Sequence, residues 1–206
     1  MNYNALHEQI PRSGDQENAT DLSRYDNSWY HPGRSGVVRL LWFLSNALVL
    51  QNIFNPSSRF KLLILRAFGA KIGKGVNLKP GINVKYPWNI EIGDYVWIGE
   101  NAWLDSLAPI KIGSHVCVSQ GAYLCTGNHD WTDPTFSLIV KPIIIENGAW
   151  IGARAVVLPG VTIASHAVVS AGSVLSQSAE AYTIYAGNPA VAVRTRTLRD
   201  VHSMSK

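Results

Sequence analysis

Aliphatic residues recur at a spacing of six from Ile72 onward, and many are followed directly by glycine or another small residue. Six is not the period of a helix, and the apolar positions are too sparse for fully buried strands. A hexapeptide fits one flat side of a parallel β-helix, with the aliphatic residue pointing inward and the next, small residue permitting a tight corner. We therefore expect an all-β coil with three sides per turn. The predicted inward positions are Ile72, Leu78, Ile92, Ile98, Ile112, Val118, Leu124, Ile145, Ile151, Val157, Ile163, Val169 and Leu175.

A longer register links successive coils. Ile90 and Ile110 are twenty residues apart and occupy the same corner, whereas the equivalent Ile143 follows Ile110 by thirty-three residues. The second interval holds about thirteen additional residues, so residues 130–142 are predicted to leave the coil as a loop. Loops carried on a rigid scaffold are common places for binding and catalytic residues.

The pattern before the repeat is different. Residues 1–35 are polar and predict an extended arm, whereas residues 36–69 are apolar enough for two helices separated by a break at Asn55-Pro56. With the β-helix at 70–181 and a C-terminal segment at 182–206, this gives four predicted parts.

The helical segment has more than one interpretation. It can cover the open end of the coil, which would otherwise expose strand edges. It can also rest on a membrane surface, with its apolar side in the interface and its arginines near lipid headgroups. Both can hold together. A transmembrane span is a third interpretation, although the apolar stretch at 37–54 is marginal for the roughly twenty residues that a span needs.

Composition narrows the class of protein. The 206-residue chain is 47% hydrophobic and only 16% charged, which excludes disorder for most of it and fits one globular domain. Two cysteines, Cys117 and Cys125, are too few for a disulfide scaffold and are interpreted as small hydrophobic residues of the repeat. The polar N-terminus does not resemble a signal peptide, so we expect a cytoplasmic location, with the inner face of the membrane as a refinement.

The net charge of +4 comes mainly from basic residues between Arg34 and Lys85 and from others at the C-terminal end. A nucleic-acid-binding protein would show a recognisable motif beside such charge, and none is present. We therefore expect no nucleic-acid partner. Anionic small ligands and membrane phosphates fit the clustering, as does a solvated basic face.

The predicted loop begins with the most informative residues of the chain. Asn128 stands where the repeat expects a small inward residue, and His129 follows at the mouth of the loop. An imidazole can take up and return a proton near neutral pH, and a hydroxyl is a poor nucleophile until a base removes its proton. His129 is therefore a candidate general base, the alternative being an ordinary surface histidine.

A zinc site is the other chemistry that histidines could supply. Three imidazoles are a common catalytic zinc set. His115, His129 and His166 are separated by fourteen and thirty-seven residues and include no close pair, so we predict no metal.

The segment Gly127–Asp130 after Tyr123–Thr126 resembles the active-site segment of hexapeptide-repeat acetyltransferases related to the maltose and galactoside acetyltransferases. A wider similarity, over about residues 22–196, resembles the colanic acid biosynthesis acetyltransferases. The resemblance implies a left-handed β-helix and a homotrimer with sites between subunits. It also implies acetyl-CoA as co-substrate and His129 as the base that deprotonates an acceptor hydroxyl.

The same resemblance suggests further site residues. Asn101 resembles the asparagine that positions the acceptor sugar, although an asparagine often simply makes a tight corner. Asp105 and Asn128 are expected beside the same hydroxyls. Gly152 and Ala153 are expected at the cofactor, and the backbone amides of the Gly148–Gly152 coil are candidates for the oxyanion donor. The segment after the last coil is expected to close over coenzyme A through Gly187, Asn188, Pro189, Arg194 and Arg196, the alternative for the arginines being a solvated basic tail.

The sequence thus predicts an acetyl-CoA-dependent O-acetyltransferase that acts on a sugar or a lipid-linked oligosaccharide in exopolysaccharide biosynthesis. Two alternatives stay open. One is a non-catalytic β-helical scaffold in polysaccharide assembly, and the other is an acyltransferase of the same fold that acts on serine or an amino sugar.

Overall fold

The computed structural model describes residues 19–199. Within them the chain forms two compact units. The coil unit contains His31–Asn128 and the residues from Val140 onward, and the loop unit contains the residues up to Tyr30 together with His129–Ile139. Each unit is described separately below. The predicted arm and C-terminal tail extend into residues 1–18 and 200–206, which lie outside the described residues.

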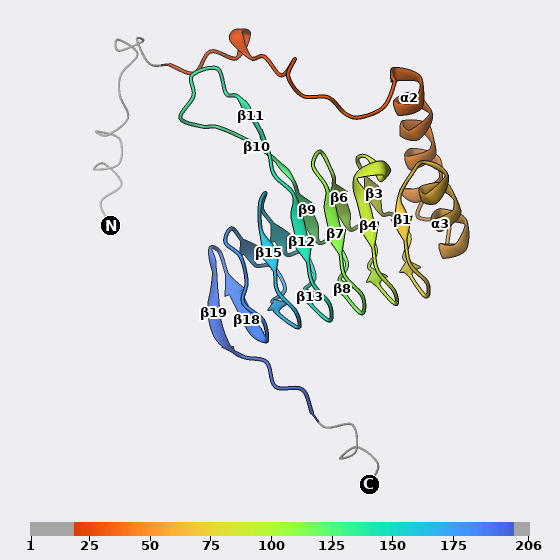
Figure 1. The fold of residues 1–206 in the computed structure, drawn as a ribbon, viewed down its shortest axis with the longest axis vertical. Helices are drawn as coiled ribbons and strands as arrows, with labels where there is room; N and C mark the ends of the chain where they lie inside the picture. Colours follow the sequence, from red (N-terminus) through yellow and green to blue (C-terminus); the bar gives the residue numbers. More distant parts are fainter. Residues whose placement is uncertain (1–18, 200–206) are drawn as a thin grey trace. The chain divides into compact units, whose positions relative to one another are not determined.

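The coil unit is a parallel β-helix built from three sheets whose strands stack coil upon coil (Figure 1). This confirms the predicted all-β, left-handed parallel β-helix with an N-terminal helical segment. The first sheet contains β1 (Lys71–Ile72), β4 (Ile90–Ile92), β7 (Ile110–Ile112), β12 (Ile143–Ile145) and β15 (Thr162–Ile163). The second contains β2 (Asn77–Leu78), β5 (Trp97–Ile98), β8 (Cys117–Val118), β13 (Trp150–Ile151), β16 (Val168–Val169), β18 (Thr183–Gly187) and β19 (Ala190–Thr195). The third contains β3 (Asn83–Val84), β6 (Trp103–Asp105), β9 (Tyr123–Cys125), β14 (Val156–Val157) and β17 (Val174–Leu175).

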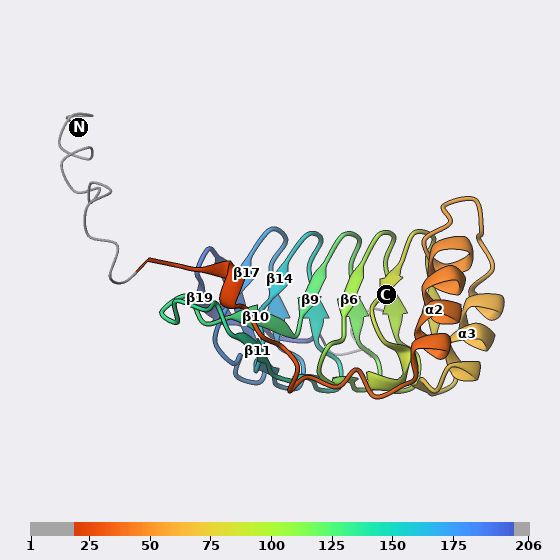
Figure 2. The same ribbon diagram turned by 90° about the horizontal axis from the view of Figure 1, so that it is seen from above.

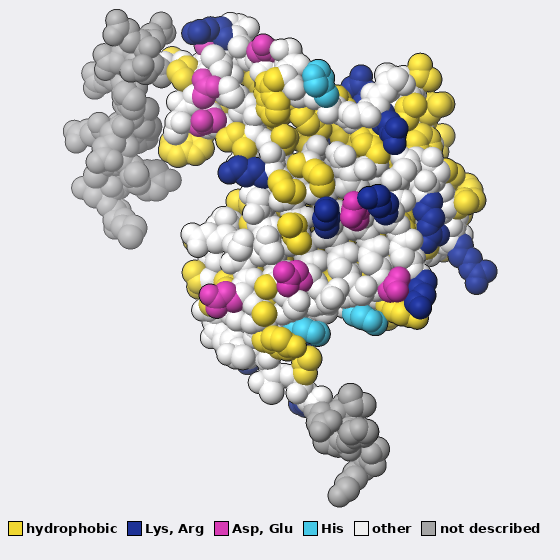
Figure 3. Space-filling view, viewed as in Figure 1, with side chains coloured by type: hydrophobic (Ala, Val, Ile, Leu, Met, Phe, Trp, Pro, Cys, Tyr) yellow, Lys and Arg dark blue, Asp and Glu magenta, His cyan; other side chains and the backbone are white. Residues whose placement is uncertain are grey.

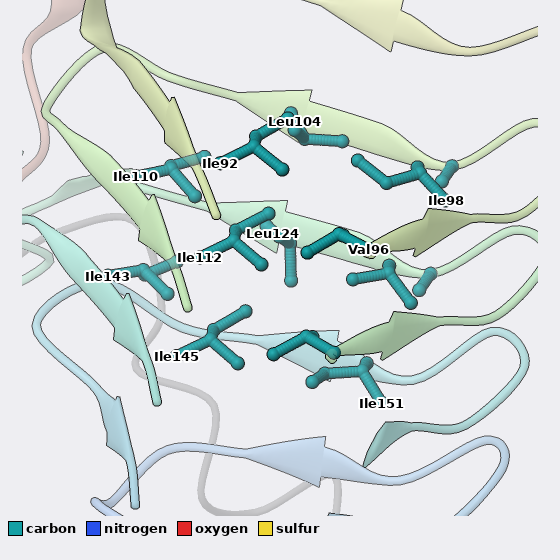
Figure 4. Packing of buried hydrophobic residues seen from close by; sticks show 14 of the residues in the cluster. Ile92, Val96, Ile98, Leu104, Ile110, Ile112, Leu124, Ile143, Ile145 and Ile151 are labelled. Atoms are coloured by element: carbon teal, nitrogen blue, oxygen red, sulfur yellow. The ribbon is translucent and has the colours of Figure 1, made fainter. Parts of the chain in front are cut away.

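The register follows the sequence pattern. Ile90 pairs with Ile110 and Ile110 with Ile143, as the intervals of twenty and thirty-three residues predicted. The side chains between the three sheets form one aliphatic core in which residues of successive coils stack in rows (Figure 4). Ile110, Leu124, Ile143 and Ile151 are each fully buried in it. The register is strongly specified because a slip by one residue would turn these side chains outward.

The glycines that follow the inward aliphatic residues have a different role from the one that the sequence suggested. A Cβ atom added at Gly93 would lie 2.7 Å from the backbone nitrogen of Ser114, and one added at Gly113 would lie 2.8 Å from that of Asn147. Both partners belong to the next coil. These glycines are therefore needed for close approach between coils, whereas the left-handed corners fall two residues later, at positions such as Tyr95 and His115.

Two helices lie across the β1 end of the coil, opposite the antiparallel pair β18 and β19 (Figures 1 and 2). Helix α2 (Gly36–Ser45) continues as one π-helical turn, η3 (Asn46–Leu50), and α3 (Ser58–Ala67) follows. The hydroxyls of Ser35 and Ser57 accept backbone hydrogen bonds at the two helix N-termini.

The inner sides of these helices are joined to the coil by polar as well as apolar contacts. Trp42 is buried, and its indole nitrogen donates to the Val84 carbonyl over 3.0 Å. Lys61 is also buried, and its ammonium donates to the Lys79 carbonyl over 3.1 Å. The helices thus cover the first coil. None of the helices in the described part of the chain is both long and apolar enough to span a bilayer.

The shorter elements complete the description. The coil unit contains the 3₁₀ turn η4 (Pro87–Asn89), and the loop unit contains η2 (Leu22–Arg24). Strands β10 (Gly127–His129) and β11 (Leu138–Val140) pair with each other in a separate two-stranded sheet. Within the loop unit, the amide of Asp21 donates to the Pro134 carbonyl over 2.8 Å, which joins the N-terminal segment to the loop.

Candidate functional site

His129 is the last residue of β10, and the loop unit determines its orientation. Its Nδ1 lies 2.8 Å from the carbonyl oxygen of Phe136, and its ring stacks on the Phe136 ring at 4.4 Å and 9°. The Tyr25 ring lies 5.6 Å away on the N-terminal segment. A carbonyl oxygen can only accept, so Nδ1 carries a proton, and the lone pair of the neutral ring is on Nε2. This is the tautomer that a base acting through Nε2 requires.

Two aspartates build the loop that presents Phe136. Asp130 accepts hydrogen bonds from the amide and hydroxyl of Thr132, and Asp133 accepts from the amide and hydroxyl of Thr135 and from the Ser137 hydroxyl. The hydrogen bonds from Ser137 and Thr135 lower the pKa of Asp133 to about 2. Because the pKa of Asp133 is lowered from its ordinary value of 3.8, the carboxylate supports the loop fully at any pH above that value. This support is lost only as the pH falls through about 2. The support is therefore present at any pH near neutrality.

Replacing Asp133 by alanine is expected to loosen the loop and lower kcat about tenfold, because a small displacement of a catalytic group is costly. Hydrogen exchange should accelerate at the amides of Thr135 and Phe136. Asp130→Ala is the matched control, since the Asp130 carboxylate accepts from Thr132 rather than from Thr135, Phe136 or Ser137, and it should change kcat by less than about threefold. Equal kcat values for wild type and Asp133→Ala would show that this carboxylate does not position His129.

The predicted acceptor residues of the coil unit are not adjacent to one another. Asp105 ends β6, is half-buried, and accepts a 3.1 Å hydrogen bond from the Tyr123 hydroxyl. Burial and hydrogen bonding to Cys125 and Asp105 raise the pKa of Tyr123 and keep it protonated. Asn101 lies at the corner before β6, with φ of 56°, so it does occupy a tight left-handed corner. An acceptor role for Asn101 stays a prediction.

Asn128 does not point inward, contrary to the expectation from the repeat. It is exposed in β10, and the last buried position before it is Thr126, two residues earlier. The Thr126 hydroxyl donates to the Asp105 carbonyl over 2.6 Å and accepts from the Ala108 amide over 2.9 Å. The inward alternation ends at Thr126, and from there β10 follows its pairing with β11.

Four of the predicted cofactor residues meet in one pocket of the coil unit. The pocket has a volume of about 530 Å³ and lies along the second sheet, beside its last strand, β19. Arg194 is exposed at this pocket, whereas Arg196 is half-buried and donates to the carbonyls of Gly148 and His166 over 3.0 Å each. Arg196 is therefore an anchor of the C-terminal segment. The lining includes the predicted Gly152, Ala153, Arg194 and Arg196, and also Ser119, Gln120 and Trp150, which the sequence did not single out.

The other predicted cofactor residues lie elsewhere. Gly187, Asn188 and Pro189 form the turn between β18 and β19, with a cis peptide before Pro189. Arg194 pairs with Ile184 near the opposite end of that hairpin. Gly187, Asn188 and Pro189 do not line the pocket of Arg194, so the predicted cofactor residues are divided between two places.

Three of the amides expected to stabilise an oxyanion make hydrogen bonds between coils. The amide of Gly148 donates to Ser114, that of Trp150 to Ala167, and that of Gly152 to Val169, over 2.7 to 2.9 Å. Inter-coil hydrogen bonding therefore engages these three donors, and an oxyanion role for an amide of this coil stays a prediction.

Two of the described histidines outside the loop, His115 and His166, lie at corners of the coil. His115 stacks on Tyr95 and His166 on Tyr182, each at a left-handed position. Among residues 19–199, no group of three or more histidine, cysteine, aspartate or glutamate side chains is arranged to hold a metal ion.

Comparison with known proteins defines the class. The family model for the bacterial transferase hexapeptide, with six repeats, matches residues 142–177. WcaF of Escherichia coli (strain K12), named as a colanic acid biosynthesis acetyltransferase, is 38% identical over 176 residues, which cover 85% of this chain and 97% of WcaF. The chain belongs to the family of hexapeptide-repeat acetyltransferases that includes WcaF.

Solved structures agree with this assignment. The hexapeptide-repeat acetyltransferase VCA0836 of Vibrio cholerae superposes with a TM-score of 0.71 at 29% identity, over 79% of this chain and 94% of that chain. A second structure of VCA0836 is a complex with acetyl coenzyme A and also gives a TM-score of 0.71, at 27% identity, over 78% of this chain and 88% of that chain. The resemblance found in the sequence is thereby confirmed, and the protein is an acetyltransferase.

Proposed function

We propose that the protein transfers an acetyl group from acetyl-CoA to a sugar hydroxyl, with His129 as the general base. The observation that carries the proposal is the 2.8 Å contact between Nδ1 of His129 and the Phe136 carbonyl, since it leaves Nε2 as the basic nitrogen. The stacking on Phe136 restrains the ring in that orientation.

In this mechanism Nε2 of His129 removes the proton of the acceptor hydroxyl while the oxygen attacks the thioester carbonyl. The tetrahedral intermediate then collapses, the bond from carbon to sulfur breaks, and the coenzyme A thiolate takes the proton back from Nε2. The products are the O-acetylated sugar and coenzyme A. Proton transfer of this kind contributes about 10² to 10⁴ in rate.

A saccharide acceptor is supported by the relatives and by the polar side chains of the coil. WcaF is named for the biosynthesis of a polysaccharide, colanic acid. We propose a sugar of an exopolysaccharide unit, free or lipid-linked, as the acceptor, with Asn101, Asp105 and Asn128 as candidate partners for its hydroxyls. The cytoplasm is the proposed location because acetyl-CoA is available there.

The pocket of Arg194 is the proposed site for acetyl-CoA, as VCA0836 binds this molecule on the same fold. Arg194→Gln is expected to raise the KM for acetyl-CoA about tenfold with little change in kcat, because an exposed guanidinium contributes to binding of the phosphates rather than to chemistry. The preference for acetyl-CoA over its 3′-dephospho analogue should shrink in parallel. Arg199→Gln lies outside the pocket and serves as the control, and an unaltered KM in Arg194→Gln would remove this arginine from the site.

We also propose a homotrimer with the active sites between subunits. The outer face of the second sheet supports this, because Trp97, Cys117 and Trp150 stand in register on successive coils. Trp97 and Trp150 are 63% and 47% exposed. Large aromatic side chains exposed in a row on one face are typical of a surface that contacts another subunit.

The proposal is tested by incubating the full chain with acetyl-CoA and a panel of acceptors, which includes neutral oligosaccharides, amino sugars and serine. Coenzyme A release that depends on an oligosaccharide supports the proposal. Release only with serine or with an amino group would assign a different acceptor, and no release with any acceptor would favour a scaffold.

A further inference from the structure

The helical segment presents an apolar surface to solvent in addition to the one it presents to the coil. Val37, Leu40, Leu41 and Leu44 recur at helical spacing on α2, and Leu48 continues the row on η3. We call these five residues the apolar stripe. All five are exposed, Leu48 by 70% and Leu40 by 59%. Spacing of three and four residues places them on one side of a helix.

The fold does not need this stripe. The opposite side of the same helix already packs on the coil through the buried residues Trp42, Asn46 and Leu50. The side-chain Nδ2 of Asn46 donates to Oδ1 of Asn83, and the side-chain Oδ1 of Asn46 accepts from the backbone amide of Val84. These two hydrogen bonds fix that side of the helix against the coil. Exposed leucines on an already satisfied helix mark a contact with something else.

The surface continues beyond the stripe. Phe54, in the connection between η3 and α3, is 87% exposed, and Ile53 beside it is also exposed. Leu63 and Phe60 add exposed side chains on α3. Large apolar residues therefore cluster on two helices and on their connection.

The charge around this surface has one sign. Residues 31–90 contain nine lysines and arginines and no aspartate or glutamate. Arg59 is exposed on α3, four residues before Leu63, whereas Arg39 lies on the side of α2 that faces the coil, where it lines a pocket with Trp42 and Asn46. Figure 3 shows basic side chains beside the hydrophobic ones over α2 and α3. An exposed apolar face on a helical segment whose charged side chains are all cationic is typical of a helix that lies in a membrane interface.

We propose that this surface docks on a bilayer containing anionic lipids, with α2 and η3 lying in the plane of the interface. The leucines of the stripe would enter the boundary between headgroups and acyl chains, and Arg59 would contact lipid phosphates. Contact with the same face of a second copy is disfavoured because it would bring the cations of the two copies together without any acidic partner. The proposal does not depend on the catalytic assignment.

The test uses the purified full chain and sedimentation with vesicles of phosphatidylglycerol and phosphatidylethanolamine, compared with vesicles of phosphatidylcholine alone. We expect the wild type to bind the anionic vesicles and to be released by high salt. The variant Leu40→Gln/Leu44→Gln/Leu48→Gln should lower the partition coefficient at least about 30-fold, since several apolar side chains lose their burial. Arg59→Gln should lower it about fivefold on the anionic vesicles only.

Leu198→Gln is the matched control, because Leu198 is an exposed leucine outside the helical segment, and it should bind as the wild type does. Hydrogen exchange of the wild type with and without vesicles avoids any folding defect of a variant, and it should show slower exchange at residues 37–50. Absence of wild-type binding, unaltered binding of the triple variant, or exchange that does not change at 37–50 would each overturn the proposal. Loss of self-association in the triple variant without any vesicle binding would assign the surface to a second copy instead.

Discussion

His129→Ala is expected to lower kcat at least about 10³-fold, because the acceptor hydroxyl then has no base to remove its proton. The KM for acetyl-CoA should change by less than about threefold, since no part of the proposed cofactor pocket is formed by this side chain. The measurement is the initial rate of coenzyme A release, followed with a thiol reagent at saturating acetyl-CoA and an oligosaccharide acceptor.

His115→Ala is the matched control for this experiment. His115 stacks on Tyr95 at a corner of the coil and has no proposed part in the chemistry, so the variant should retain most of the activity. Circular dichroism would show that both variants keep the β-helix. If His129→Ala retained more than about a third of wild-type kcat, the general-base assignment would be wrong.

Gly93→Ala should destabilise the coil by about 3 kcal/mol, which corresponds to a fall in Tm of about 6 to 12 °C for a chain of this size. The added methyl group would lie 2.7 Å from both the backbone nitrogen and the hydroxyl oxygen of Ser114 in the next coil. That backbone is held by the hydrogen bond from the Gly93 amide to the Ile112 carbonyl, at 2.7 Å, so it cannot easily move away. Thermal unfolding followed by circular dichroism measures the effect.

Gly36→Ala provides the comparison. A methyl group at Gly36 has only the end of the flexible Arg39 side chain within 4 Å, at 3.9 Å, and alanine is favourable in a helix. Its Tm should equal or slightly exceed that of the wild type. A Tm for Gly93→Ala within about 2 °C of the wild type would contradict the close approach between coils as the reason for these glycines.

The sequence was sufficient for the fold because the repeat is local and regular. Each inward aliphatic residue is set by its own hexapeptide, and the interval between Ile110 and Ile143 locates the extra residues without any long-range information. The role of the glycines after the aliphatic residues could not be read in this way. Close approach between coils is a contact between residues about twenty apart, which the period alone does not distinguish from a tight corner.

The site was less accessible to sequence analysis. His129 could be proposed from its position at the loop, but its orientation depends on the carbonyl of Phe136, and backbone atoms leave no signature in a sequence. The turn-forming residues Asp133 and Thr135 were the available signal for that loop. Asn128 was assigned to an inward position because the alternation was extended one step too far, past Thr126.

The C-terminal segment shows a similar limit. Arg194 and Arg196 are two residues apart and looked equivalent, yet only Arg194 is exposed at the pocket, whereas Arg196 holds backbone carbonyls. The distinction depends on the hairpin of β18 and β19 folding against the last coils, which is a tertiary contact.

The central claim is that His129 activates a sugar hydroxyl for attack on acetyl-CoA. Mass spectrometry of an oligosaccharide panel after incubation with acetyl-CoA and the full chain tests it most directly. The account predicts that the wild type adds one acetyl group, through oxygen, to at least one saccharide, and that His129→Ala adds none in the same time. Acetylated saccharide formed equally by both proteins, or acetyl transfer confined to amino groups, would contradict it.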